Sequence, residues 1–160
     1  MRTIAILDNI RSVHNVGSIF RTADAAGIEK IYCCGITPGP LDRFKKVRAD
    51  FAKVALGAEK SVAWEVVKST ADSIVELRKD GWKIFAIEQA ENSIPYNSIS
   101  RADDERENRI ALVVGPEVEG LSESILKLCD AILEIPMRGK KESLNVAVAF
   151  GIVVFHLIQK

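Results

Sequence analysis

The stretch Ile110-Ala111-Leu112-Val113-Val114-Gly115-Pro116-Glu117-Val118-Glu119-Gly120-Leu121 predicts the class of fold. Its first five side chains form an uninterrupted apolar run, which is typical of a strand covered on both faces. Such strands occur in parallel sheets that carry helices on each side. A loop bounded by two glycines follows, at the end of the strand where open α/β sheets bind ligands. We therefore expect an α/β protein with a ligand site at this loop.

The rest of the chain alternates strand and helix patterns in the same way. Strand-like runs cover residues 3–7, 30–34, 82–87 and 131–135, and helical patterns cover 16–26, 70–79 and 122–129, with a last helix opened by Ser143. We expect residues 42–64 to mix a short helix with a loop, and residues 91–108 to form a surface loop with a fragment of helix. No repeat, linker or low-complexity tract interrupts this order. The pattern predicts a single domain over residues 1–160, with a parallel-dominated sheet and helices on both faces.

The last helix is apolar on nearly every side. Between residues 144 and 158 only Asn145, the small Gly151 and His156 break the apolar run. A helix that is apolar all round must be covered all round. A central position over the sheet would provide that cover. A second copy of the chain packed on the outer face would also provide it, and we favour this second interpretation.

Composition narrows the class of protein. Hydrophobic residues make up 48% of the 160 residues and charged residues 28%, which fits a soluble globular chain. The start does not have the pattern of a secretory signal, and the longest apolar run, 146–155, is shorter than the about 20 residues of a membrane span. Three cysteines without a CxxC pair, and two histidines that cannot complete a metal site with them, predict reduced thiols and no metal. We expect a cytoplasmic protein without a membrane partner.

The net charge of zero means that an RNA partner would have to meet a local basic patch. Two clusters of cations could form such a patch, and a solvated charged face is the alternative interpretation. The candidate phosphate-contacting residues are Arg43, Lys45, Lys46, Arg48 and Lys53, with Arg138, Lys140 and Lys141.

Familiar nucleotide motifs are missing, so a cosubstrate pocket must have another design. The sequence has no GxGxxG, no phosphate loop and no glycine-rich acidic motif of Rossmann-type methyltransferases. Arg21 stands among small and apolar helix neighbours, which predicts that it points toward an anionic partner. An ion pair with Asp24 or Glu117 is the alternative.

Three further polar residues stand near expected helix starts. Asn15 and Ser143 precede helices, and the default interpretation of each is a helix N-cap. Asn145 is expected inside the last helix, where asparagine is unfavourable, and this suggests a functional role.

Three segments together resemble the motifs of the SpoU–TrmH branch of the SPOUT methyltransferases. They are Asn15-Val16-Gly17-Ser18-Ile19-Phe20-Arg21-Thr22-Ala23, Gly115-Pro116-Glu117-Val118-Glu119-Gly120-Leu121 and Ile135-Pro136-Met137-Arg138-Gly139-Lys140-Lys141-Glu142-Ser143-Leu144-Asn145. The match covers essentially the whole chain, and the intervening order of strands and helices agrees.

The resemblance implies a fold, an activity and partners. Members of this family are homodimers whose α/β domain carries a deep trefoil knot at its carboxyl end, a rare exception to the rule against threaded chains. They transfer a methyl group from S-adenosylmethionine to a ribose 2′-hydroxyl of tRNA or rRNA. Many relatives carry an additional amino-terminal RNA-binding domain, which we do not expect here.

The resemblance also implies roles for individual residues. Arg21 matches the arginine proposed to activate the ribose hydroxyl, and Asn15 matches a residue that helps to place it. Glu117 matches the carboxylate of the second motif. Ser143 and Asn145 match the polar pair of the third. The positions whose backbone holds the methyl donor correspond to Gly115, Ile135 and Leu144, and a further donor-contacting position corresponds to Ile87.

The chemistry of arginine favours one role for Arg21 over another. A guanidinium has a pKa above about 12 and does not normally release its proton in proteins. We therefore expect that the positive charge of Arg21 stabilises the alkoxide that develops on the ribose oxygen. Direct proton transfer to Arg21 is the second possibility. Two alternative functions stay open: methylation of the tRNA wobble ribose by the compact branch of the superfamily, and a non-catalytic RNA-binding relative.

Overall fold

A single parallel sheet organises the computed structural model, which describes residues 1–99 and 109–159. Its strand order is β3-β2-β1-β6-β4-β7-β5, and every pairing between the described strands is parallel. The strands are β1 (Arg2–Asp8), β2 (Lys30–Cys34), β3 (Ala63–Val67), β4 (Lys83–Ile87), β5 (Ile94–Pro95), β6 (Arg109–Val114) and β7 (Ala131–Glu134). The expected parallel α/β sheet is confirmed.

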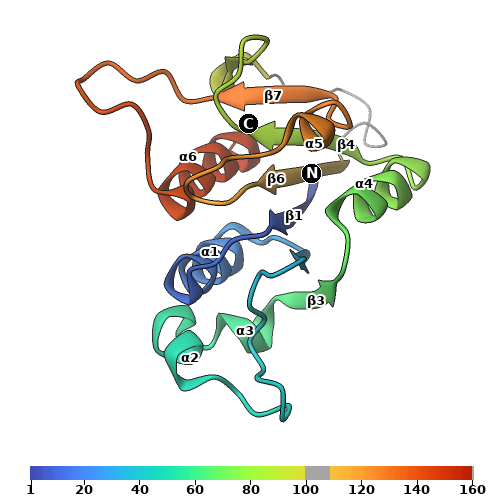
Figure 1. Ribbon diagram of the computed structural model, residues 1–160, viewed down its shortest axis with the longest axis vertical. Coiled ribbons are helices and arrows are strands. Elements are labelled where there is room, and N and C mark those ends of the chain that lie inside the picture. The colour runs from blue at the N-terminus through green and yellow to red at the C-terminus, as the bar shows by residue number, and fades with distance from the viewer. Residues whose placement is uncertain (100–108, 160) are drawn as a thin grey trace.

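Helices cover both faces of this sheet, as expected (Figure 1). They are α1 (Val13–Ala26), α2 (Ala49–Ala55), α3 (Ala58–Ser61), α4 (Thr70–Lys79), the 3-10 helix η1 (Tyr96–Ser98), α5 (Glu123–Leu126) and α6 (Val146–Ile158). Alternate residues of one strand point to opposite faces. Leu7 packs into the core shared with α1 and α6, and Ile6 packs into the core shared with α4 and α5.

β6 lies at the centre of the sheet, between β1 and β4. Leu112 pairs with Ala5 on one side and Phe85 on the other, and it has no exposed surface. This burial explains why the strand is apolar at every position. The loop that follows it begins at the carboxyl edge of the sheet.

Both helix starts that flank the candidate site differ from the expectation. Ser12 is the N-cap of α1, and its Oγ accepts a hydrogen bond from the backbone N–H of Asn15 at 3.2 Å. Asn145 is the N-cap of α6, and its Oδ1 accepts from the N–H of Ala147 at 2.9 Å. The N-cap assignments of Asn15 and Ser143 were therefore wrong. Asn145 is not in a helix interior, because the backbone turns helical only after it.

The segment 42–64 contains more regular structure than expected. It holds α2, α3 and the start of β3, an edge strand that the sequence analysis missed. Three of the five β3 residues are exposed, so the strand lacks an apolar run. The helix expected over 122–129 is shorter, since α5 ends at Leu126. Of the surface loop expected over 91–108, residues 91–99 contain β5 and η1, and residues 100–108 lie outside the described chain.

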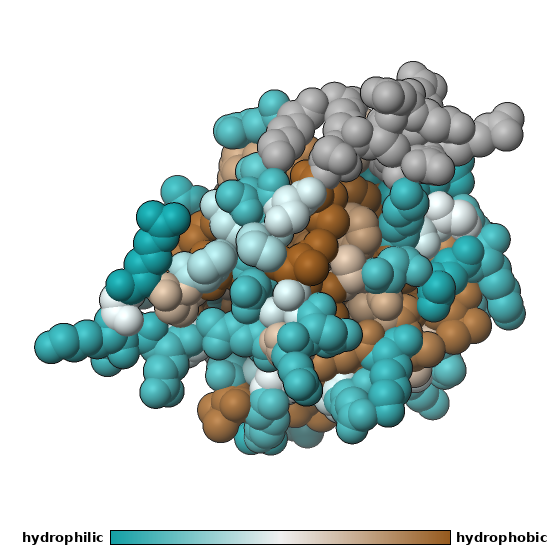
Figure 2. All heavy atoms as spheres, turned by 90° about the horizontal axis from the view of Figure 1, so that it is seen from above, coloured by the Kyte–Doolittle hydropathy of each residue, from teal (hydrophilic) through white to brown (hydrophobic). Residues whose placement is uncertain are grey.

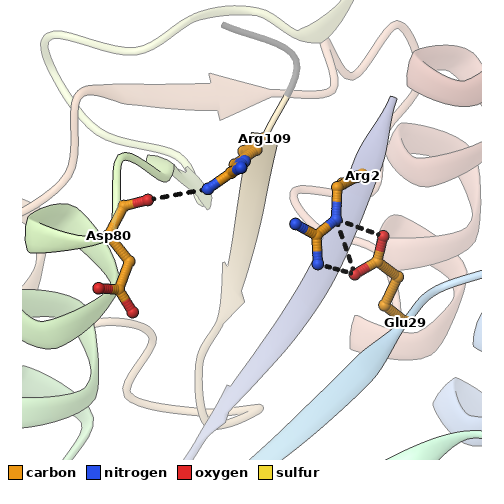
Figure 3. Close-up of polar contacts among 4 residues, drawn as sticks. All are labelled: Arg2, Glu29, Asp80 and Arg109. Carbon is orange, nitrogen blue, oxygen red and sulfur yellow. Dashed lines mark hydrogen bonds and ion pairs between the residues drawn. The ribbon is translucent and has the colours of Figure 1, made fainter. Parts of the chain in front are cut away.

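Ion pairs and hydrogen bonds tie the amino-terminal ends of the central strands to their neighbours (Figure 3). Arg2 at the start of β1 donates from Nε and Nη2 to the two carboxylate oxygens of Glu29, at 2.9 and 2.8 Å. Arg109 at the start of β6 donates from Nη1 to the carbonyl oxygen of Asp80 at 3.2 Å. These contacts lie at the edge of the sheet opposite the motif loops.

α6 is buried on one side only within a single chain. Phe150, Val153, Val154 and Leu157 are buried against the sheet and α1, whereas Val148 on the outer side is 51% exposed. The expectation of cover on every side is thus not met by this chain alone. No helix in the described part of the chain has the length and apolar character that crossing a membrane requires.

Candidate functional site

A cleft of about 400 Å³ opens at the carboxyl ends of β4, β6 and β7. The loop after β6, residues 115–121, forms one wall, and the segment after β7, residues 135–145, forms another. In Figure 1 this second segment is the long orange connection that projects between β7 and α6. The volume lies within the range of small-molecule sites, about 300–1,000 Å³.

The residues that the motif resemblance associates with the methyl donor all line this cleft. These donor-associated residues are Ile87, Gly115, Ile135 and Leu144. The carboxylate of the second motif, Glu117, and the polar pair of the third motif, Ser143 and Asn145, line the same cleft. They come from three separate segments, which the parallel sheet brings to one edge.

Two glycines allow the 115–121 loop to approach its neighbours closely. A Cβ on Gly115 would lie 2.8 Å from the Leu121 side chain and 2.9 Å from its backbone nitrogen. Gly120 has a φ of +68°, and a Cβ there would lie 2.7 Å from Oε2 of Glu88. Only glycine fits these positions without a shift of the surroundings.

A chain of hydrogen bonds connects all three motifs beside the cleft. Asn145 donates from Nδ2 to Oδ1 of Asn15 at 3.0 Å. Asn15 in turn donates from Nδ2 to Oε1 of Glu117 at 2.9 Å. Asn15 is only 9% exposed, so both ends of its amide are held in place. The start of α1, the loop after β6 and the start of α6 are thereby joined.

The same contacts determine the charge of Glu117. Desolvation by its surroundings would raise the pKa of Glu117, but the hydrogen bonds from the Asn15 amide and from backbone N–H groups outweigh this effect and lower the pKa. One of the backbone donors is the N–H of Ser12, at 3.4 Å. Glu117 is therefore an anion at neutral pH.

Two residues after β4 complete the walls of the cleft and were missed by the sequence analysis. Glu88 accepts from the N–H of Leu121 through Oε2 at 2.9 Å, and from the N–H of Gln89 through Oε1 at 2.9 Å. Gln89 donates from Nε2 to the carbonyl oxygen of Glu142 at 2.9 Å. These bonds attach β4 to both motif loops. The available signal was their position directly after a strand end at the carboxyl edge.

Arg21 is not at this cleft. Its side chain is exposed on α1 and lines a separate shallow depression with His14, Lys53 and Phe155. The six residues that separate it from Asn15 correspond to about 9 Å along a helix and a rotation of about 240°. Arg21 therefore faces away from the direction in which Asn15 points.

The alternative expectation for Arg21, an ion pair with a nearby carboxylate, is wrong. Within residues 1–99 and 109–159, it forms no ion pair with Asp24 or Glu117. Asp24 accepts from Oγ of Ser61 at 2.5 Å, and Glu117 is engaged by Asn15.

The thiols do not offer a nucleophile. Burial raises the pKa of Cys33 to about 12 and that of Cys34 to about 11, and it likewise raises the pKa of Cys129 to about 11. All three are free and protonated at neutral pH.

In the described ranges, no group of three or more His, Cys, Asp or Glu residues could hold a metal ion.

Six of the eight predicted basic residues lie in two loops, whereas Arg48 is the N-cap of α2 and Lys53 lies within that helix. Arg43, Lys45 and Lys46 are exposed between β2 and α2, and Arg138, Lys140 and Lys141 are exposed between β7 and α6. Figure 2, a view from above, shows the polar connection between β7 and α6 projecting at the left edge, beside a region of apolar side chains.

Comparison with known proteins matches residues 2–155 to the model of the SpoU rRNA Methylase family. A 23S rRNA (guanosine-2'-O-)-methyltransferase RlmB from Ralstonia nicotianae is 35% identical over 158 residues, which are 98% of this chain and 58% of the relative. RlmB from Escherichia coli K12 is 32% identical over 98% of this chain and 60% of its own length. The chain thus spans about 60% of the length of these relatives.

Solved structures show the same architecture. The AdoMet-bound rRNA methyltransferase from Sinorhizobium meliloti superposes with a TM-score of 0.86 and 28% identity, over 99% of this chain and 56% of that one. The A. aeolicus TrmH/SpoU tRNA modifying enzyme gives a TM-score of 0.81 and 28% identity, over 98% and 74% of the two chains.

Proposed function

Because this chain belongs to the SpoU rRNA methylase family, we propose that it methylates a ribose 2′-hydroxyl of RNA, with S-adenosylmethionine as the methyl donor. One observation carries the proposal: the Asn145–Asn15–Glu117 chain joins the three motifs at a cleft of small-molecule size. The two RlmB relatives are named for 23S rRNA, and a 32% identical relative from Staphylococcus aureus is named "Putative TrmH family tRNA/rRNA methyltransferase". We propose ribosomal RNA as the substrate class, because it is common to these names.

The cleft fits the donor. Gly115 lets the strand end pack directly against Leu121 in the wall of the cleft, and the backbone at Gly115, Ile135 and Leu144, with Ile87, would hold the donor. When bound, S-adenosylmethionine supplies an electrophilic methyl group on a sulfonium. The anionic Glu117 lines the cleft and favours a positive charge there.

The polar chain beside the cleft has a positioning role in this proposal. Asn15 uses its oxygen for Asn145 and one N–H for Glu117. A side-chain amide has a second N–H, which remains for an oxygen of the substrate ribose. Ser143 lines the same wall and could contact the same ribose.

Arg21 must reach a cleft of another protomer to take part. We propose a homodimer in which the outer side of α6 and the depression around Arg21 and Phe155 face a second copy. The guanidinium would then stabilise the alkoxide that develops on the ribose oxygen, as a permanent cation and not as a base. The half-exposed α6 supports this arrangement.

The test is Arg21→Ala. We expect loss of methyl transfer to RNA from cells that lack the gene, because the developing charge is no longer stabilised; removal of one such donor typically costs about 10²–10³ in rate. The affinity for S-adenosylmethionine, measured by calorimetry, should stay within about twofold of the wild type. Equal loss of donor binding would contradict the role.

A mixing experiment separates action across the dimer from action within one chain. Ile135→Trp would fill the cleft and abolish donor binding while leaving Arg21 in place. Random pairing of Arg21→Ala with Ile135→Trp subunits should restore about a quarter of the activity, because half of the dimers contain one complete site. If Arg21 acted within its own chain, the mixture would stay inactive.

A non-catalytic RNA-binding relative is the competing function. Calorimetric titration with S-adenosylmethionine decides between them, because such a relative need not bind the donor.

Methylation of the tRNA wobble ribose is the other alternative. A solved structure titled for the 2-OH methylation of C/U34 on tRNA has 23% identity and shows only the shared fold.

The finer details of the fold also belong to this proposal. We propose one methyltransferase domain over residues 1–160, with a carboxyl-terminal trefoil knot. The high TM-scores with SpoU-type structures support it, as does the position of the 135–145 segment beside the 115–121 loop. An experimental structure in which residues 135–159 do not thread through the preceding chain would overturn the knot.

A further inference from the structure

Residues 41–47 form a short hairpin after β2, which we call the 41–47 hairpin. Leu41 and Val47 pair as an antiparallel bridge, and the N–H of Asp42 donates to the carbonyl oxygen of Lys46 at 2.8 Å. The carboxylate of Asp42 accepts from the N–H groups of Phe44 and Lys46 through Oδ1, at 2.8 and 2.9 Å. Lys45 has a φ of +59° at the turn. The tip therefore has a defined conformation.

This conformation keeps an aromatic ring outside the core. Phe44 is 66% exposed, and the guanidinium carbon of Arg43 lies 4.7 Å from the centroid of its ring. A cation over an exposed ring is stabilising. Its contribution is smaller than that of burying a phenylalanine side chain in the core. An exposed ring in a fixed turn is typical of a contact surface.

The cations of the tip are not neutralised by the protein itself. Across the described chain, Arg43, Lys45 and Lys46 form no ion pair, whereas Arg48 at the base pairs with Asp50 at 3.3 Å. The one carboxylate of the hairpin, Asp42, is occupied by backbone N–H groups. The tip thus presents three positive charges in a protein of zero net charge.

We propose that the 41–47 hairpin binds unpaired RNA, with Phe44 stacked on a base and Arg43, Lys45 and Lys46 beside the flanking phosphates. This rests on the proposed function and names a substrate contact for it. Exposed aromatic rings among cations bind single strands, because every unpaired base offers a face for stacking. A fully paired duplex keeps these faces inside its stack.

The position of the hairpin agrees with this assignment. It follows β2, two strands from β6 in the sheet order, at the same carboxyl edge as the cleft. Adjacent strands are about 4.8 Å apart, so the ends of β2 and β6 are separated by roughly 10 Å. Residues 35–40 separate the hairpin from the end of β2 and add to this distance, so an RNA strand that contacts both the hairpin and the cleft must extend across β1 and β2.

The experiment measures binding of the full chain to a fluorescein-labelled, unstructured 20-nucleotide RNA by anisotropy. Phe44→Ala should weaken binding by roughly 5- to 150-fold, the loss expected for one base–aromatic stack. Phe44→Trp should bind as the wild type does. Val75→Ala, a matched change at an exposed apolar residue of α4, should have no effect.

Salt dependence and duplex RNA give independent readouts. Lys46→Gln should reduce the slope of log affinity against log salt by about 0.7, the value for one phosphate contact with a single strand. The duplex form of the same RNA should bind wild type and Phe44→Ala alike.

The outcomes separate this inference from the proposed function. Unchanged binding by Phe44→Ala, equal losses in Val75→Ala, or no binding of single-stranded RNA by a wild type that still binds S-adenosylmethionine would each overturn the hairpin assignment. Loss in Phe44→Ala alone supports it, even if the wild type binds no S-adenosylmethionine. Absence of S-adenosylmethionine binding by the wild type would instead overturn the methyltransferase proposal.

Discussion

At the scale of single residues, the side chain of Asn15 is held at both ends beside the cleft. Its amide oxygen and nitrogen are both engaged, by Asn145 and Glu117, and it is nearly buried. A reversed amide would place oxygen against the Glu117 carboxylate, so the orientation follows from charge. The polar chain therefore holds Glu117 in its anionic form and in one position.

The lowered pKa of Glu117 predicts a dependence of stability on pH. Its hydrogen bonds stabilise the folded chain fully above the pKa of an unfolded glutamate, about 4.3, and the gain is lost as the pH falls through the lower folded value. Denaturant titrations should show the advantage of wild type over Glu117→Gln shrinking as the pH falls below about 5. The effect should stay below about 1 kcal/mol, because solvent screens this exposed side chain. An advantage that grows with acid would contradict the assignment.

Residue roles were partly predictable from sequence. Ile87, Gly115 and Ile135 lie at or directly after strand ends, and this position is visible in the sequence. Ser143, Leu144 and Asn145 precede α6, and the motif resemblance identified them. Glu88 was missed because its importance comes from two backbone N–H groups, one of them 33 residues away. The surroundings of Arg21 could not be predicted, because helical spacing does not say which neighbour faces an exposed side chain.

At the scale of elements, the 115–121 loop depends on its glycines. Gly120→Ala places a side chain at a φ of +68° and 2.7 Å from Oε2 of Glu88. We expect a loss of about 1–2 kcal/mol in the free energy of unfolding, because the left-handed conformation is costly for other residues. Weaker binding of S-adenosylmethionine should accompany it.

Gly139→Ala is the matched control for this prediction. A Cβ at Gly139 would meet no atom within 4 Å, and its φ is not positive. Thermal unfolding of the two variants, measured side by side, should show a loss for Gly120→Ala only. Equal melting temperatures would show that the loop tolerates a side chain.

Elements were predictable where burial is strong. β6 could be identified because Ile110–Val114 are all covered by neighbouring strands and helices. β3 was missed because an exposed edge strand has no such run. The starts of α1 and α6 were misplaced by a few residues, since more than one polar residue could cap each helix and the sequence does not rank them.

At the scale of the whole molecule, one face of α6 lacks cover. Val148→Asp places a charge on this outer face, where we propose that a second copy packs. We expect a shift from dimer to monomer in light scattering after size-exclusion chromatography. Val75→Asp on α4, exposed on the other side of the sheet, should leave the mass unchanged. Identical masses for both variants and wild type would contradict the interface.

The Asn15–Asn145 bond also has a consequence for synthesis. The two residues are 130 positions apart in the chain, so a nascent polypeptide emerges with half of the contact long before the other half exists. At about 5–20 residues per second, the gap corresponds to roughly 7–26 s of translation. Until then the pocket has no finished wall, and a partly made chain cannot capture its ligand.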